Sequence, residues 1–332
     1  MIEVSHLTRR YASNFAVRDL SFTIGGGTVC GFIGPNGAGK STTLNMLTGC
    51  LEPTSGTISI CGYDLQREPI AARRCLGFLP EQPPLYPDMT PYEYLRFVAS
   101  ARGVKRSEAD VQVRWAMSAV QIKQMSDRLI RNLSKGYRQR VGIAQALLGD
   151  PPVILLDEPM DGLDPTQIVE MRDMIRDLGS RHTVLLSSHI LSEVSAICDR
   201  ILILSRGALV ADDTPDALSR RIAEASTLRL RVRGTEEAAR ACLASVPGIG
   251  EVKISPDAQD GVVQAAVTAG QSDELCERVF FAFSSAGVPL LQMQTDQPDL
   301  EDVFLALTAQ TRAKEPEFEE EEGNGNDGSL SP

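Results

Sequence analysis

One short stretch near the amino terminus restricts the fold of this chain more than any other. It follows the strand-like run Val29–Ile33, precedes a segment with helical spacing, and matches the pattern Gly-x-x-x-x-Gly-Lys-[Ser/Thr]. Its residues are Gly34, Pro35, Asn36, Gly37, Ala38, Gly39, Lys40, Ser41 and Thr42. Such a loop turns backbone N–H groups and the positive end of a helix toward a phosphate. The sequence therefore predicts a phosphate-binding loop in an α/β fold, in preference to an ordinary glycine-rich turn.

Two side chains of this loop have expected contacts of their own. Lys40 supplies a positive charge for the β- and γ-phosphates of a nucleotide. The Ser41 hydroxyl is a ligand for Mg²⁺. Both contacts indicate a nucleoside triphosphate as the bound molecule.

A second signal follows the continuous apolar run Val153–Leu156, which is typical of a strand buried on both faces. The run ends in Asp157 and Glu158, at the sheet edge where open α/β sheets bind ligands. Adjacent carboxylates repel each other unless a cation is present, so we expect Asp157 to hold Mg²⁺ through a bound water. Glu158 then orients or deprotonates an attacking water. A pair of surface carboxylates is the alternative, but few surfaces begin with four large aliphatic residues.

Four further positions carry weaker signals. His189 ends another apolar strand at the same sheet edge, so we expect it to reach a γ-phosphate, although a histidine there is usually structural. Tyr11 either stacks on a purine or is merely half-buried. Ser134 suits a helix N-cap, with a second anion site as the other interpretation. Gln82, after a short strand, indicates nothing by itself.

Length and composition indicate a globular protein of more than one domain. A chain of 332 residues is longer than chains that usually fold around a single hydrophobic core. The net charge is −11, but residues 315–332 hold seven acidic and no basic side chains, which leaves 33 basic against 37 acidic residues, or −4, elsewhere. We therefore expect no nucleic-acid partner. The seven cysteines are too dispersed for a zinc site or a disulfide framework and suit buried thiols in the cytosol.

The pattern of strands and helices predicts a large first domain, residues 1–222, with a helical insertion at about residues 90–149. Thr90, Pro91 and Glu93 form an N-cap signature for a helix that ends near residue 101. Ser107 is expected to open the next helix, which carries Val111, Trp115 and Val120. Residues 201–204 complete the expected sheet, and residues 11–15 are expected in a polar connection.

The rest of the chain has a different pattern of expected strands and helices. The order strand, helix, strand, strand, helix, strand across residues 223–310 predicts a small α+β domain of the ferredoxin-like type. A regulatory or dimer-stabilising role for it is a guess from the fold alone. Residues 300–307 form an expected amphipathic helix, and residues 311–332 an acidic, disordered tail. The amino terminus does not resemble a signal peptide, and no apolar run approaches about 18 residues, so we expect any membrane role to depend on a partner.

The motifs taken together resemble the nucleotide-binding subunit of ATP-binding cassette (ABC) transporters. The resemblance covers residues 1–222, and the motifs occur in the family's order. They are the adenine-stacking aromatic Tyr11, the Walker A loop Gly34–Thr42, the Q-loop Gln82, the signature Leu133-Ser134-Lys135-Gly136-Tyr137, the Walker B pair Asp157 and Glu158, the D-loop Asp161–Asp164 and the switch His189. The family's usual signature, Leu-Ser-Gly-Gly-Gln, differs at two positions, and the D-loop opens with Asp161-Gly162 where Ser-Ala is common. Similar variants, with a final Leu-Glu-Asp-Val-Phe-like helix, occur in the subfamily that pairs with ABC-2-type export permeases.

This resemblance implies a complete set of roles. Glu158, His189 and Gln82 act in catalysis, and Ser41, Gln82 and Asp157 surround Mg²⁺. Besides the loop, Tyr11, Ser134, Gly136 and Asp164 contact ATP, with Ser134 and Gly136 reaching the ATP of a second cassette in a homodimer or heterodimer. Hydrolysis drives a separate integral membrane permease, which places the chain in the cytoplasm on the inner face of the cell membrane.

Three rival interpretations stay open. Another P-loop class, such as a GTPase or a small-molecule kinase, would need a base-reading motif or an acceptor pocket, and we find neither. A cassette protein that acts without a permease usually has two cassettes or a long coiled-coil insertion, and this chain has one Walker A loop and no heptad run. A regulator that binds ATP without hydrolysing it is disfavoured by the complete Walker B and switch positions.

Overall fold

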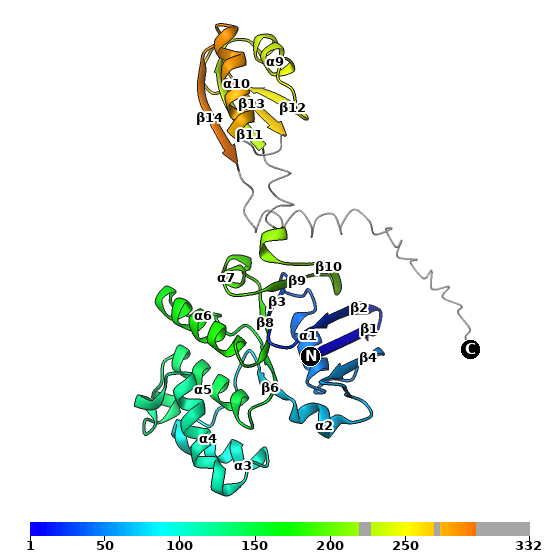
Figure 1. Ribbon diagram of the computed structural model, residues 1–332, viewed down its shortest axis with the longest axis vertical. Coiled ribbons are helices and arrows are strands. Elements are labelled where there is room, and N and C mark those ends of the chain that lie inside the picture. The colour runs from blue at the N-terminus through cyan, green and yellow to red at the C-terminus, as the bar shows by residue number, and fades with distance from the viewer. Residues whose placement is uncertain (219–226, 269–272, 297–332) are drawn as a thin grey trace, which may run out of the picture.

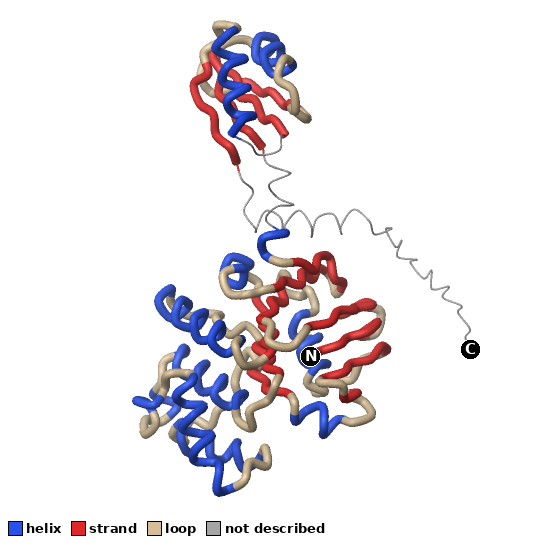
Figure 2. Tube along the Cα trace, viewed as in Figure 1, coloured by secondary structure: helices blue, strands red, loops and turns tan. Residues whose placement is uncertain are grey.

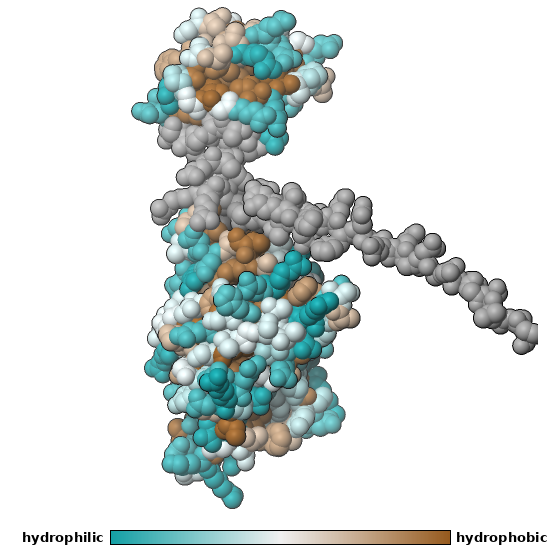
Figure 3. All heavy atoms as spheres, turned by 90° about the vertical axis from the view of Figure 1, so that its right-hand side faces the viewer, coloured by the Kyte–Doolittle hydropathy of each residue, from teal (hydrophilic) through white to brown (hydrophobic). Residues whose placement is uncertain are grey.

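The computed structural model describes residues 1–218, 227–268 and 273–296 (Figure 1). Its strands form two sheets in the first of these segments and a third sheet in the other two. Among the described residues, no helix is both long and apolar enough to cross a membrane. Figure 3 shows one side of the molecule, where apolar residues are scattered among hydrophilic ones over residues 1–218.

A six-stranded sheet lies at the centre of the first segment, in the order β10-β9-β3-β8-β7-β6. All neighbouring strands run parallel except β9 and β10. Every residue of β3, β7 and β8 is buried, as their continuous apolar runs predict. The strands are β3 (Val29–Ile33), β6 (Leu76–Leu79), β7 (Val153–Leu156), β8 (Thr183–Ser188), β9 (Arg200–Ser205) and β10 (Ala208–Asp213).

The edge strand β10 corrects our prediction that residues 201–204 complete the sheet. The turn between β9 and β10 has only two residues, Arg206 and Gly207, with φ values of 48° and 80°. Two positive φ angles are typical of the tight hairpin turn that follows strand twist. Arg-Gly is a weaker signal for this turn than Asn-Gly, which is why the sequence did not reveal it.

The second sheet, β2-β1-β4-β5, is antiparallel and packs on α1 (Lys40–Leu47). Our placement of residues 11–15 in a connection was wrong, because Tyr11 ends β1 and Phe15 lies in β2, with Ala12-Ser13 as the turn. Leu44, Met46 and Leu47 of α1 share one core with residues of both sheets. Burial of each such side chain stabilises the folded state by about 1.5–3 kcal/mol. The strands are β1 (Ile2–Tyr11), β2 (Asn14–Ile24), β4 (Ser55–Ile60) and β5 (Tyr63–Asp64).

Helices cover the other face of the central sheet (Figure 2). The predicted capping box is confirmed, because the Thr90 side chain accepts a bond from Glu93 N while the Glu93 carboxylate accepts one from Thr90 N. The next helix begins one residue earlier than predicted, at Arg106. Val120 is buried and Trp115 packs on the core, but Val111 is 69% exposed. The buried residues of this helix are Ala109, Val113, Ala116 and Met117. The helices on this face are α3 (Pro91–Ala101), α4 (Arg106–Ala119), the short 3-10 turns η1 (Lys123–Met125) and η2 (Ile130–Asn132), α5 (Lys135–Leu147), α6 (Pro165–Gly179) and α7 (Leu191–Ser195). The short helix α2 (Pro69–Arg74) instead buries Ala72 in the core shared with the second sheet.

The C-terminal residues form a separate sheet with its own core, in the antiparallel order β12-β13-β11-β14. This order and the chain order βαββαβ confirm the ferredoxin-like prediction. The predicted boundary at residue 222, the helix at 300–307 and the acidic tail lie outside the described residues. The elements are β11 (Thr227–Arg233), α9 (Glu236–Ala244), β12 (Val252–Pro256), β13 (Val262–Thr268), α10 (Asp273–Ser285) and β14 (Leu290–Asp296).

Candidate nucleotide-binding site

The glycine-rich loop connects β3 to α1 and leaves no room for side chains at two positions. A Cβ atom at Gly34 would lie 2.7 Å from the Leu204 carbonyl oxygen. One at Gly39, where φ is +102°, would lie 2.4 Å from the Ala16 carbonyl oxygen. Glycine is therefore required at both ends of the loop, which the neighbouring strands hold against α1.

Lys40 is the buried cation of the site, with 6% of its surface exposed. Its Nζ donates to the Gly34 carbonyl oxygen at 2.7 Å and forms an ion pair with Glu158 Oε1 at 3.3 Å. A buried charge is costly unless it is paired in this way. The first turn of α1 thus holds its positive charge over the loop, where the sequence predicts the phosphates.

Asp157 follows β7 and is buried beside two serine hydroxyls. Ser187 Oγ donates to Asp157 Oδ1 at 2.6 Å, and Ser41 Oγ donates to the same oxygen at 3.3 Å. Burial raises the pKa of the Asp157 carboxyl, while the bonds from Ser187 and Ser41 act in the opposite direction. A carboxylate and a hydroxyl this close fit Mg²⁺, which takes few protein ligands and completes its shell with water and substrate phosphates.

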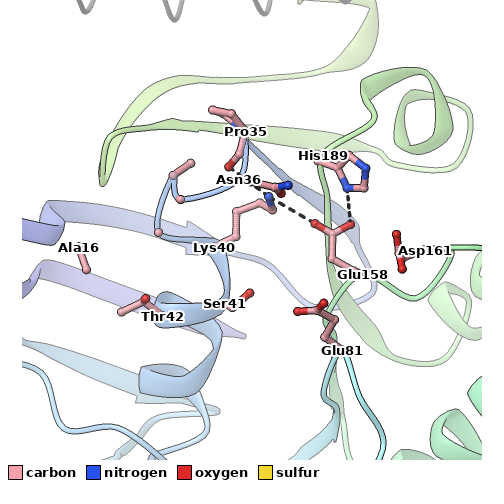
Figure 4. Close-up of a pocket in the computed structure, with 13 residues that line it drawn as sticks. Ala16, Pro35, Asn36, Lys40, Ser41, Thr42, Glu81, Glu158, Asp161 and His189 are labelled. Atoms are coloured by element: carbon pink, nitrogen blue, oxygen red, sulfur yellow. Dashed lines mark hydrogen bonds and ion pairs between the residues drawn. The ribbon is translucent and has the colours of Figure 1, made fainter.

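Glu158 points away from Asp157 because its backbone is in the left-handed region, with φ at +47°. Its backbone N–H donates to Ser187 Oγ at 2.8 Å, which fixes the turn. Its carboxylate lies between Lys40 and His189 (Figure 4), and His189 Nδ1 is 3.0 Å from Glu158 Oε2. A non-glycine residue in this conformation costs about 1–3 kcal/mol and is common at functional sites. The two adjacent carboxylates therefore have different surroundings.

These groups border a cavity of about 540 Å³. Among the predicted residues, Pro35–Thr42, Glu158 and His189 line it. Gly34 and Asp157 are not part of its wall but contact it through Lys40 and Ser41. The cavity is open to solvent along one side, where His189 is more exposed than Glu158.

Five further predicted residues do not line this cavity. Tyr11 is 48% exposed, with the Arg9 guanidinium 4.6 Å from its ring centre, and Gln82 is exposed. Ser134 and Asp164 are helix N-caps, accepting from Tyr137 N and Gln167 N. Gly136 lies in the first turn of α5, against Gln167. Their roles in nucleotide binding stay predictions.

The structure adds three residues that the sequence did not single out. Ala16 and Glu81 line the cavity, as does Asp161 of the D-loop, and Ser187 bonds to Asp157 and Glu158. A signal existed for Ser187, because two serines end an otherwise apolar strand. None existed for Glu81, which differs from Gln82 only by one position along an exposed loop.

The unusual signature and D-loop residues contact each other. Lys135 Nζ forms an ion pair with Asp161 Oδ2 at 2.9 Å. A Cβ atom at Gly162, where φ is +63°, would lie 2.3 Å from the same Nζ. The three residues therefore form one contact between the start of α5 and the turn before α6, which we call the Lys135 contact.

Comparisons with known proteins give one consistent result. The family model described as "ABC transporter" matches residues 17–161. The uncharacterized ABC transporter ATP-binding protein YhcH of Bacillus subtilis is 32% identical, over 94% of this chain and 97% of its own length. The bacitracin transport ATP-binding protein BcrA of Bacillus licheniformis is 32% identical, over 92% of this chain and 97% of its own. The dimeric structure of MJ0796, a bacterial ABC transporter cassette, is 25% identical with a TM-score of 0.59, over 65% of this chain and 99% of that one.

Proposed function

This chain belongs to the ATP-binding proteins of ABC transporters, and we propose that it hydrolyses ATP to drive a separate permease of the ABC-2 export type. The observation that carries the proposal is the position of Glu158, between the loop lysine Lys40 and His189 and beside Asp157. This arrangement supports the proposed roles of an anion-binding loop, a Mg²⁺-binding carboxylate and a base at one site.

Each group has a role in the proposed reaction. Lys40 binds the β- and γ-phosphates, and Glu158 orients or deprotonates the water that attacks the γ-phosphorus. His189 holds the Glu158 carboxylate and reaches the γ-phosphate from the exposed side of the cavity. Ser41 and Asp157 would hold Mg²⁺, which neutralises charge on the phosphates.

The Lys40–Glu158 ion pair suggests how nucleotide binding prepares the base. Without nucleotide, Lys40 neutralises the carboxylate that has to act on water. An arriving triphosphate offers Lys40 a stronger, multiply charged partner. We expect Lys40 to turn to the phosphates and release Glu158 toward the water.

A second cassette completes the proposed site. Ser134 and Gly136 do not line the cavity of their own chain, yet the start of α5 presents backbone N–H groups suited to an anion. The related cassette MJ0796 was solved as a dimer. We therefore propose a head-to-tail homodimer or heterodimer, with ATP between the loop of one chain and α5 of the other.

Export is proposed from the relatives, one of which is named for bacitracin transport. The proposed location is the inner face of the cell membrane, through the permease. The domain limits at residues 222 and 310 are part of the same proposal. A cassette that works without a permease would bind no membrane protein, which distinguishes the two.

Glu158→Gln tests the chemistry and the dimer together. Glutamine keeps the shape but removes the base, so we expect ATP binding with turnover lowered roughly 10²–10⁴-fold. ATP held without hydrolysis should keep two chains together, as an ATP-dependent dimer in light scattering. Glu193→Gln is the matched control, because this nearby carboxyl does not line the cavity. Wild-type turnover in Glu158→Gln would remove Glu158 from the base role, and a strict monomer with ATP bound would contradict the shared site.

A further inference from the structure

One carboxylate at the proposed nucleotide site has a charge that no described side chain neutralises. Three carboxylates line the cavity: Glu81, Glu158 and Asp161. Glu158 forms an ion pair with the loop lysine, and Asp161 forms one with Lys135. No ion pair or hydrogen bond joins the Glu81 carboxylate to any other described group, and no dashed line reaches it in Figure 4. Glu81 therefore adds a full negative charge to the cavity wall.

The pairing of two strands brings Glu81 to the cavity. Strands β6 and β7 run parallel and are paired up to Leu79 and Leu156, so both end at the same edge of the sheet. A glutamate stands two residues beyond each end, Glu81 after β6 and Glu158 after β7. Figure 4 shows the Glu81 side chain pointing into the cavity, toward the first turn of α1. The next residue, Gln82, does not line the cavity.

The charge of Glu81 opposes a nucleotide that carries no metal. A triphosphate on the loop would share the cavity with this carboxylate, and like charges repel more strongly where water is excluded. Ser41, which also lines the cavity, donates to Asp157, and these two residues are the proposed protein ligands of Mg²⁺. A divalent cation that arrives with the nucleotide would be attracted by Glu81, directly or through its water shell. Glu81 thus acts in opposite directions on the two forms of the nucleotide.

We propose that Glu81 is a specificity residue, which makes the site select ATP that carries a divalent cation over metal-free ATP. The inference rests on the proposed ATP site and adds a discrimination between two forms of the same ligand. A neutral amide at this place could not repel the free triphosphate, because it carries no charge. The selection comes from a penalty on the wrong ligand as well as from contacts with the right one. ATP then enters the site together with the metal that the proposed hydrolysis uses.

Calorimetric titration with a nonhydrolysable ATP analogue, in excess Mg²⁺ and in EDTA, tests the proposal. The measured quantity is the ratio of the Kd in EDTA to the Kd in Mg²⁺. Glu81→Gln keeps the size of the side chain and removes its charge, so the Kd in EDTA should fall roughly 5- to 20-fold, while the Kd in Mg²⁺ stays equal or rises. The ratio therefore falls. An unchanged ratio in a variant that still binds the analogue would overturn the proposal.

Two control variants separate the position of this charge from its mere presence. Glu81→Gln combined with Gln82→Glu moves the carboxylate one residue along the loop at constant net charge, and its ratio should match that of Glu81→Gln alone. Glu193→Gln removes a charge near His189 that does not line the cavity, so the ratio should stay at the wild-type value. A wild-type ratio in the double variant, or an equal fall in Glu193→Gln, would overturn the assignment to Glu81.

Mn²⁺ binding gives the reciprocal measurement, read from the metal and independent of ATPase activity. With the analogue bound, paramagnetic resonance should show Mn²⁺ held several-fold more weakly by Glu81→Gln than by wild type, because coupling between two ligands is mutual. Equal Mn²⁺ affinities would contradict the selection by Glu81 alone. A wild-type chain that binds no analogue in either buffer would instead refute the ATP site itself, so the two failures are distinguishable.

Discussion

Asp157 and Glu158 are neighbours in the chain, yet the structure gives them different chemistry. Asp157 is buried under two hydroxyl groups, whereas Glu158 turns through a positive φ angle to face a lysine and a histidine. Glu158 lines the cavity, whereas Asp157 contacts it only through Ser41. The left-handed turn at Glu158 therefore gives two consecutive carboxylates different positions at one site, as the proposed roles of metal ligand and base require.

The raised pKa of Asp157 predicts a pH dependence for the nucleotide-free protein. A carboxyl whose pKa is higher folded than unfolded binds its proton more tightly when folded. Its charge therefore destabilises the fold at neutral pH, and this effect disappears as pH falls through the folded pKa toward about 3.9, the unfolded value. Asp157→Asn keeps an oxygen for both serines, so we expect a higher thermal unfolding midpoint than wild type at pH 7.

The measurement is a pair of melting series from pH 7 to pH 4. The difference between Asp157→Asn and wild type should shrink as the pH falls, and other titrating groups cancel in the comparison. If the difference between the two midpoints stays constant with pH, burial of the Asp157 charge is not the cause of that difference. Mg²⁺ should raise the midpoint of wild type with ATP more than that of the variant.

Lys40→Ala should lose nucleotide affinity. Charge-assisted hydrogen bonds contribute about 1.5–3 kcal/mol each, so the Kd for ATP should rise about 10- to 100-fold by calorimetry. Lys123→Ala, in the exposed turn η1, is the control for removal of one lysine. Unchanged affinity in Lys40→Ala would contradict the assignment of the loop.

The sequence predicted the residues around Lys40 because they are consecutive and their spacing carries the chemistry. It could not predict that Glu81, and not Gln82, lines the cavity. The two residues are adjacent in an exposed loop, and the loop conformation alone decides which side chain points to the cavity. Nor could it show the Lys40–Glu158 ion pair, which joins residues far apart in the chain.

At the scale of elements, two helices begin with the same device and allow a controlled test. Ser134 caps α5 and Thr90 caps α3, each accepting from the backbone N–H three residues later. Replacing either with alanine should cost about 1 kcal/mol of stability. If α5 also binds the ATP of a second chain, only Ser134→Ala should weaken ATP-dependent dimerisation and turnover.

Urea unfolding measures the first effect, and light scattering with ATPase assays measures the second. Equal turnover in Ser134→Ala and Thr90→Ala, after correction for stability, would limit Ser134 to capping.

Elements with strong local signals were predictable, and those that depend on pairing were not. The Thr90 capping box needs four consecutive residues, so its sequence sufficed. Strand β10 depends on a two-residue turn without the usual asparagine and on β9 as its partner. The first hairpin was missed for the same reason, because pairing of β1 with β2 places Tyr11 opposite Asn14.

At the scale of the whole molecule, the helical subdomain has an exposed aromatic surface. Tyr86 and Phe97 are 46% and 48% exposed, with ring centres 5.5 Å apart, and Tyr86 also packs edge-on against Tyr94. The loop that carries Tyr86 is held on the core by Leu85 and Met89. We propose this surface as the contact for a cytoplasmic helix of the permease.

Tyr86→Ala should then separate ATP hydrolysis from transport. The isolated chain should keep wild-type ATPase activity, while the amount of membrane protein that copurifies from detergent extracts should fall several-fold. Val111→Ala, exposed on α4 of the same subdomain, is the control. Undiminished copurification with Tyr86→Ala would place the permease elsewhere.

The Lys135 contact limits how this chain can be redesigned. Grafting the common Leu-Ser-Gly-Gly-Gln pentapeptide would remove the cation that pairs with Asp161 at the cavity wall. An alanine at position 162 would be strained, because φ there is +63°, and it would displace Lys135 Nζ from Asp161. Neither exchange is conservative alone. Residues 133–137 and residues 161–164 should therefore be exchanged together or left unchanged when this chain is redesigned.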